Sequence, residues 1–283
     1  MFSNTIVSTE ELAQYLNDPH WIVFDCRFTL TDAEAGRRAY AAGHIPGARY
    51  AHLDEDLSGP IVSGQTGRHP LPDPEALAQR LHDWGVGVNR QVVVYDDSFG
   101  AMAVRMWWLL RWLGHPGVAL LDGGLPKWQR EMRPMTTELP QTQPGNCVCL
   151  PERSQYVEAD EVSAAIAGGD GLLIDARPDR RFTGEYEPLD PVAGHIPGAI
   201  NWVFEENLDL DGTYLPPEAL RENYQALLQG RPPHQVIHTC GSGVTACHNL
   251  LAMEIAGLPG SKLYVGSWSD WITDPARPVA TGE

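Results

Sequence analysis

Basic side chains are scarce in this sequence of 283 residues. It has 20 lysines and arginines against 37 aspartates and glutamates, and its formal net charge is −17. Such a chain offers no basic surface for nucleic acid or for an anionic membrane, so we expect neither as a partner. An anionic substrate must then be attracted by local groups rather than by the field of the whole protein.

Long apolar runs and paired cysteines are also lacking. No apolar run approaches the roughly 18 residues of a membrane-spanning helix, and the first ten residues show neither the basic nor the apolar part of a signal peptide. The five cysteines are an odd number and form no C-x-x-C ligand set, so we interpret Cys147 and Cys149 as incidental thiols. We therefore expect a cytoplasmic protein without a metal site or disulfide framework.

The sequence contains an internal duplication. Gly43-His-Ile-Pro-Gly-Ala48 recurs as Gly194-His-Ile-Pro-Gly-Ala199, and an Asp-x-Arg precedes each copy. A shift of about 143 residues aligns the two halves and places Asp97 over Cys240. A polar, proline-rich stretch separates them. We expect one domain over 1–135, a linker over 136–155 and a second domain over 156–283.

Each half alternates short apolar runs rich in β-branched residues with helical patterns. Examples are Trp21–Phe24 and Val92–Tyr95 in the first half, and Leu172–Ile174 and Val236–His238 in the second. This alternation predicts an α/β fold in which each domain is a parallel sheet flanked by helices.

One loop has the features of a site for a reactive thiolate. An apolar strand pattern runs into Cys240, which is followed by Gly241-Ser-Gly243 and a helical pattern over roughly 244–256. The glycines let the backbone curl so that its N–H groups can point at the sulfur, and the helix start adds its positive dipole end. Both effects lower the pKa of a thiol, so the pattern predicts that Cys240 is a nucleophile at the carboxyl end of a strand.

At these residues the chain resembles the tandem-domain rhodanese family of sulfurtransferases, whose N-terminal repeat is catalytically silent and whose C-terminal repeat carries the loop cysteine. The resemblance covers nearly the whole chain. The uncharged loop Cys240-Gly-Ser-Gly-Val-Thr245 is similar to the 3-mercaptopyruvate branch, whereas the thiosulfate branch typically has basic residues after the cysteine.

The resemblance implies that the protein transfers sulfur in two steps. A small donor, preferably 3-mercaptopyruvate, would pass its sulfur to Cys240 as a persulfide, and a thiol such as thioredoxin or glutathione, or cyanide, would remove it. No organic cofactor or metal is required. The persulfide would be cradled by the backbone of Gly241, Gly243, Val244 and Thr245.

The resemblance also implies roles for four side chains. Ser242 would relay a proton near the leaving group, assisted by residues that match Asp54 and His69, which lie in the first half. Arg181 matches the family's arginine for the substrate carboxylate. Many members have a second arginine further along this segment, where the present chain has Tyr186-Glu-Pro-Leu-Asp190 and no basic residue.

Two alternatives remain beside this prediction. The chain could be a thiosulfate:cyanide sulfurtransferase, or a non-catalytic carrier that receives a persulfide from a partner protein. A cysteine phosphatase is a poor match, because its Cys-x5-Arg signature needs an arginine where this chain has Ala246.

Overall fold

The structure is a computed structural model that describes residues 2–147, 149–169 and 171–282. The chain divides into two compact units. The first consists of Met1–Gly59, Leu71–Glu152 and Leu208–Tyr214, and the second of Pro60–Pro70, Arg153–Asn207 and Leu215–Glu283. Each unit thus takes one short segment from the other half of the sequence, and residues 60–70 belong to the second unit.

Each unit contains a five-stranded sheet, and the strand pairs between described residues are parallel. The first sheet has the order β1-β5-β4-β2-β3, built from β1 (Ile6–Val7), β2 (Trp21–Asp25), β3 (Arg49–Tyr50), β4 (Gln91–Tyr95) and β5 (Val118–Leu121). The second has the equivalent order β6-β10-β9-β7-β8, built from β6 (Tyr156–Val157), β7 (Leu172–Asp175), β8 (Ile200–Asn201), β9 (Val236–Thr239) and β10 (Lys262–Tyr264).

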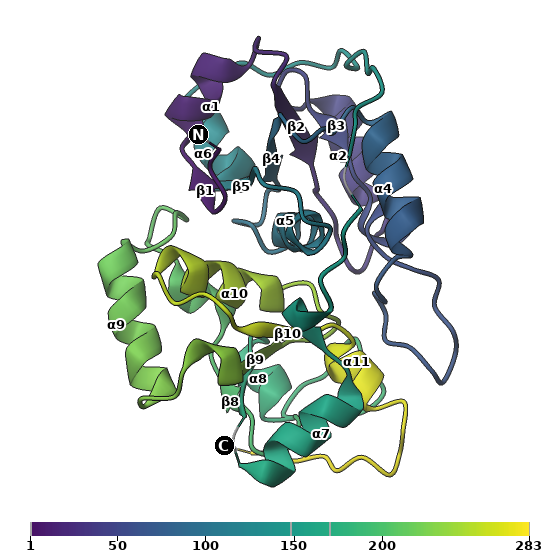
Figure 1. Ribbon diagram of the computed structural model, residues 1–283, viewed down its shortest axis with the longest axis vertical. Coiled ribbons are helices and arrows are strands. Elements are labelled where there is room, and N and C mark those ends of the chain that lie inside the picture. The colour runs from purple at the N-terminus through teal and green to yellow at the C-terminus, as the bar shows by residue number, and fades with distance from the viewer. Residues whose placement is uncertain (1, 148, 170, 283) are drawn as a thin grey trace. The chain divides into compact units, whose positions relative to one another are not determined.

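Helices surround the strands within each unit (Figure 1). Those of the first unit are α1 (Thr9–Tyr15), α2 (Ala35–Ala42), α3 (Leu53–Asp56), α4 (Pro74–Asp83), α5 (Ala103–Trp112) and α6 (Gly124–Arg130). Those of the second are α7 (Ala159–Gly168), α8 (Asp179–Phe182), α9 (Pro217–Leu228), α10 (Ala246–Ile255) and α11 (Ser267–Trp271), with 3-10 turns at Arg153–Gln155, Phe204–Asn207 and Pro233–Gln235. The prediction of two parallel sheets flanked by helices is confirmed.

Burial explains why the central strands lack an alternating pattern. All five residues of β4 and all four of β9 are buried, as in parallel sheets whose two faces are both covered by helices. Helix α5 packs against β4 and β5, and α10 packs against β9 and β10. Trp107, Trp108 and Trp112 of α5 are all buried in this packing.

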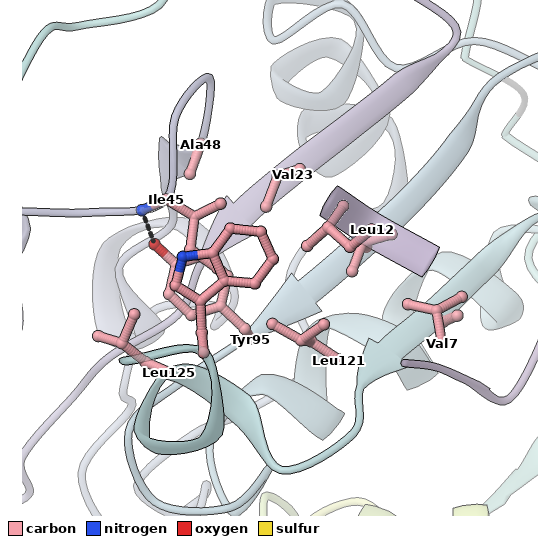
Figure 2. Close-up of a cluster of buried hydrophobic side chains, with 11 residues drawn as sticks. Val7, Leu12, Val23, Ile45, Ala48, Tyr95, Leu121 and Leu125 are labelled. Atoms are coloured by element: carbon pink, nitrogen blue, oxygen red, sulfur yellow. Dashed lines mark hydrogen bonds between the residues drawn. The ribbon is translucent and has the colours of Figure 1, made fainter. Parts of the chain in front are cut away.

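One face of the first sheet carries a hydrophobic cluster (Figure 2). Leu12 of α1 and Leu125 of α6 pack there with strand residues such as Val23, and burying each such side chain stabilises the fold by about 1.5–3 kcal/mol. The Tyr95 hydroxyl, inside the cluster, accepts a hydrogen bond from the Ile45 amide at 3.2 Å. The duplicated Gly-His-Ile-Pro-Gly-Ala segment therefore anchors to the sheet through its isoleucine.

The ends of two helices bear on the sequence patterns. Ser8 caps α1 and accepts a hydrogen bond from the Glu11 amide at 3.0 Å. The helix after Cys240 is shorter than the pattern indicated, because residues 244 and 245 still belong to the loop. No helix among the described residues combines the length and apolar character needed to span a membrane.

Candidate active site

Cys240 follows the last residue of β9 and precedes α10 by six positions, and it is buried, with 1% of its surface exposed. The start of α11 fixes the loop backbone. The amides of Trp268 and Ser269 donate to the carbonyls of Cys240 and Gly241 at 3.0 and 2.9 Å. The loop thus lies at the carboxyl edge of the second sheet, where open α/β sheets bind ligands.

Hydrogen bonds lower the pKa of the Cys240 thiol. Burial acts in the opposite direction, but the Thr245 hydroxyl and the backbone amides of Ser242 and Ala246 donate to the sulfur and outweigh it. Cys26 provides the contrast in the first unit: burial, Asp25 and Asp96 raise the pKa of that thiol well above the ordinary value. The amide-lined loop, rather than burial, therefore distinguishes Cys240 as the acidic thiol.

The two loop glycines are needed for different reasons. Gly243 has φ of +78°, in the left-handed region that favours glycine. Gly241 instead leaves space for cations: a Cβ atom there would lie 2.9 Å from Arg68 Nη2 and 3.5 Å from Arg181 Nη1. The loop sequence therefore combines a tight turn with close approach of two guanidinium groups.

Ser242 links the sulfur to an imidazole. Its amide donates toward the Cys240 sulfur, and its hydroxyl lies 2.7 Å from Nδ1 of His69. Both side chains are buried, with 5% and 4% of the residue surfaces exposed. His69 lies in the segment 60–70, which comes from the first half of the sequence but belongs to the second unit. The structure thus brings together Cys240, Ser242, His69 and Thr245.

Asp190 is held by two arginines. Its Oδ1 contacts Arg68 Nη1 and its Oδ2 lies 3.1 Å from Arg181 Nη2. Glu187 completes the cluster: it accepts hydrogen bonds from Arg181 Nε and Nη2, and its pKa is lowered because Arg181 and the amides of residues 189 and 190 outweigh the effect of burial. These carboxylates fix the direction in which both guanidinium groups point.

Arg68 is a site residue that the sequence interpretation missed. The segment around Asp190 has no second arginine of its own, but Arg68 supplies one from the loop before His69. Arg68 Nη2 and Arg181 Nη1 donate no hydrogen bond to any described residue, and both are directed to the space above Gly241. The only available signal was adjacency, because Arg68 directly precedes the predicted His69.

Ser267 supports the thiol-bearing residue from α11. Its hydroxyl accepts a hydrogen bond from the Cys240 amide at 3.1 Å and lies 4.0 Å from the sulfur. It is fully buried and has φ of +53°, which is strained for a residue with a Cβ. The first unit has glycine, Gly124, at the matching turn with φ of +55°. The duplication thus contained a signal for Ser267, namely a serine where the other repeat has glycine.

The sheet register corrects the residue that matches Cys240 in the first unit. Asp25 pairs with Tyr95 as Asp175 pairs with Thr239, so the residue after Tyr95, Asp96, matches Cys240. The prediction of Asp97 is wrong by one position. The reason is that the loop to α5 is one residue longer than the loop to α10, and sequence alignment placed the extra residue before the loop.

The Asp96 carboxylate fills the loop of the first unit that matches the Cys240 loop. Its carboxylate is fully buried and accepts four backbone hydrogen bonds at 2.8 Å, from residues 98, 100, 102 and 103. Asp97, in contrast, is exposed. The loop of the first unit thus has the same anion-binding form as the Cys240 loop but is filled by an internal carboxylate.

Asp54 belongs to the first unit, in α3, where its amide donates to Nδ1 of His52 at 3.2 Å. Among the described residues, one group has metal-ligand spacing: Glu34, His52 and Glu55, also in the first unit. Nδ1 of this histidine accepts from backbone amides and Nε2 lies 3.1 Å from the Ala33 carbonyl. Both ring nitrogens are therefore engaged by the backbone.

Comparison with known proteins identifies the family. The rhodanese-like domain matches twice, at residues 8–131 and 158–274. A probable 3-mercaptopyruvate sulfurtransferase of Pseudomonas aeruginosa is 50% identical over 284 residues, which cover 100% of both chains. A putative thiosulfate sulfurtransferase, SseB of Mycobacterium tuberculosis, is 38% identical over 98% of this chain and 97% of its own.

A solved structure agrees with these matches. The crystal structure of SseA from Escherichia coli, a 3-mercaptopyruvate sulfotransferase with the rhodanese fold, superposes with a TM-score of 0.79 at 32% identity, over 94% of this chain and 100% of that one. The chain therefore belongs to the rhodanese family, as a protein with two rhodanese-like domains. The resemblance predicted from the sequence is confirmed.

Proposed function

We propose that this protein is a 3-mercaptopyruvate sulfurtransferase whose nucleophile is Cys240. The observation that carries the proposal is the combination of an amide-held, acidic sulfur with two guanidinium groups directed over Gly241. A donor that has both a transferable sulfur and a carboxylate fits this pair of features. The names of the Pseudomonas aeruginosa and Escherichia coli relatives support the same donor.

The first half-reaction forms a sulfur–sulfur bond. The Cys240 thiolate attacks the sulfur of 3-mercaptopyruvate, the carbon–sulfur bond breaks, and its electron pair stays on the methylene carbon of the enolate. The donor's thiol proton moves to that carbon, which gives pyruvate and an enzyme persulfide. Ser242 and His69, 2.7 Å apart, are positioned to relay this proton, and polarisation by the imidazole makes the hydroxyl a better donor.

The second half-reaction returns the free thiolate. An acceptor thiolate or cyanide attacks the outer sulfur, the sulfur–sulfur bond breaks, and its electron pair returns to Cys240. Between the two steps the persulfide is stabilised by the Thr245 hydroxyl and by the amides of the loop, Gly241, Gly243 and Val244 among them. Dividing the transfer into two displacements at sulfur is ordinary covalent catalysis and needs no organic cofactor.

Arg68 and Arg181 are proposed to bind the donor carboxylate. Their unused N–H groups are directed at Gly241. In a protein of net charge −17, such a local pair is needed to hold an anionic donor. Arg68 thus takes the place of the second arginine that the segment 186–190 lacks.

The remaining assignments rest on family resemblance. We propose that Asp54 assists His69, that residues 1–135 form the catalytically silent domain, and that 156–283 form the catalytic domain after a linker at 136–155. The acceptor is proposed to be a thiol such as thioredoxin or glutathione, or cyanide. All five cysteines are free thiols, which fits the proposed cytoplasmic location.

Thiosulfate is the competing donor, and the name of the Mycobacterium tuberculosis relative favours it. The loop from Cys240 to Ala246 has no charged side chain, which suits a monoanionic keto acid better than a dianion. The deciding experiment compares kcat/KM for 3-mercaptopyruvate and thiosulfate with one acceptor. We expect 3-mercaptopyruvate to be preferred, and a tenfold preference for thiosulfate would overturn the assignment.

A non-catalytic persulfide carrier is the other candidate. Such a protein would accept sulfur only from a protein partner. Repeated turnover of 3-mercaptopyruvate with a dithiol acceptor, followed as pyruvate release, excludes it.

A further inference from the structure

A pocket lined by both polar and apolar residues lies in the first unit and has no part in the proposed sulfur transfer. Its volume is about 590 Å³, within the range of small-molecule sites. It is bordered by the turn after α1, by the start of β2 and β3, and by the segment 140–143. Its lining includes Asn17, Asp18, Trp21, Arg49, Arg90 and Gln141.

Two arginines face this pocket without an acidic partner. Among the described residues, neither Arg49 nor Arg90 has a carboxylate oxygen within 4.0 Å, although the chain has 37 acidic residues against 20 basic ones. Their hydrogen bonds go to backbone carbonyls: Arg49 Nη1 to Gly47 at 3.3 Å and Arg90 Nη1 to Gly85 at 2.7 Å. The Nε of Arg49 is buried and makes no hydrogen bond with the described residues.

The two guanidinium groups are also close to each other. A Cβ atom on Gly85 would lie 3.2 Å from Arg90 Nη1 and 3.7 Å from Arg49 Nη2. Burial and the charge of Arg90 lower the pKa of Arg49. The two positive charges therefore repel each other. An anion bound between them would offset this repulsion.

We propose that this pocket binds the phosphate group of a small organic phosphate between Arg49 and Arg90. Arginine is suited to phosphate because its planar N–H groups can form paired hydrogen bonds with two oxygens. The pocket is much larger than a phosphate ion, and Trp21 provides an apolar wall beside the two cations. Asp18, the one carboxylate of the lining, accepts the His20 amide at 2.8 Å.

The test measures binding to the full chain. The indole signal of Trp21, assigned with Trp21→Phe, is followed by nuclear magnetic resonance while adenosine monophosphate or inorganic phosphate is added. We expect saturable binding that Arg49→Gln and Arg90→Gln each weaken at least tenfold, as the loss of one charged hydrogen bond implies. Arg231→Gln is the matched control, because Arg231 also lacks an acidic partner in the described part of the chain but lies in the other unit.

Each outcome has a defined meaning. Tighter binding of adenosine monophosphate than of inorganic phosphate supports an organic ligand, while equal binding supports a site for the phosphate group alone. Both variants should keep sulfur transfer and unfold thermally as the wild type does, which verifies that both units are folded. If neither probe shifts the Trp21 signal, or if the arginine variants bind as the wild type does, the proposal is wrong.

Discussion

Arg68 and Arg181 hold the two oxygens of one carboxylate, that of Asp190, although Arg68 and Asp190 are 122 positions apart in the sequence. This shared carboxylate directs the free N–H groups of both arginines toward Gly241. The predictions below follow from this arrangement and from the thiolate loop beside it.

Removing either guanidinium should weaken binding of the donor more than it slows the chemical step. We expect Arg68→Ala and Arg181→Ala each to raise KM for 3-mercaptopyruvate by roughly tenfold to a hundredfold, because a charged hydrogen bond contributes about 1.5–3 kcal/mol. kcat should change less, since the donor carboxylate is altered little in the transition state. Steady-state kinetics checks this.

The control is Arg180→Ala, which removes an adjacent but exposed arginine paired with Glu185. Its KM should stay within about twofold, as expected for a surface ion pair of small energy. A large fall in kcat with unchanged KM in the Arg68 or Arg181 variant would show that these groups act in chemistry instead.

The acidity of Cys240 should depend on Thr245. The pKa of the Cys240 thiol in the folded protein lies below the ordinary value of a cysteine. As pH falls, the folded protein therefore keeps its thiolate to a lower pH than an unfolded cysteine does. Thr245→Val removes one donor to the sulfur and should move the titration to higher pH. Thiolate absorbance, taken as the difference from Cys240→Ser, measures the shift.

Thr183→Val is a suitable comparison, because that hydroxyl contacts only the Arg180 carbonyl at 3.4 Å. An ionised Cys240 also stabilises the fold above the ordinary thiol pKa, and this contribution disappears as pH falls through the pKa of the folded thiol. Identical titrations of Thr245→Val and wild type would refute the role of the hydroxyl.

Asp96 should matter for folding and Asp97 should not. Asp96→Ala would leave four amides, two of them buried and two partly buried, without their acceptor, so we expect a loss of about 3 kcal/mol or more in the free energy of unfolding of the first unit. Asp97→Asn, at an exposed position, should change it by no more than about 0.5 kcal/mol. Thermal unfolding of both variants shows which of the two residues, Asp96 or Asp97, stabilises the first unit.

The sequence was sufficient to predict the fold and to single out the Cys240 loop, because both leave local patterns. The duplicated Gly-His-Ile-Pro-Gly-Ala segment and the alternation of apolar runs with helical patterns predicted two parallel sheets. The glycines on either side of Ser242 predicted the cradle around Cys240, and the structure gives it the amide donors that the pattern requires.

The missed residues depend on information that is not local. Arg68 comes from the segment 60–70, which lies in the first half of the sequence but belongs to the second unit, and its partner Asp190 is distant in the sequence. The error at Asp97 arose because one extra loop residue can be placed in several ways until the strand register is known. Ser267 adopts a left-handed backbone conformation that a serine does not by itself indicate, and its signal lay in the other repeat, where the matching residue is Gly124.

The most direct test of the account is intact-mass analysis after treatment with 3-mercaptopyruvate. The account predicts one added sulfur, located on Cys240 by peptide mapping, removed by cyanide, and absent from Cys240→Ser. Cys247→Ser should still gain the sulfur, because Cys247 is buried in α10 with its Sγ 3.6 Å from the Gly243 carbonyl. Sulfur on Cys247, or undiminished transfer by Cys240→Ser, would contradict the account.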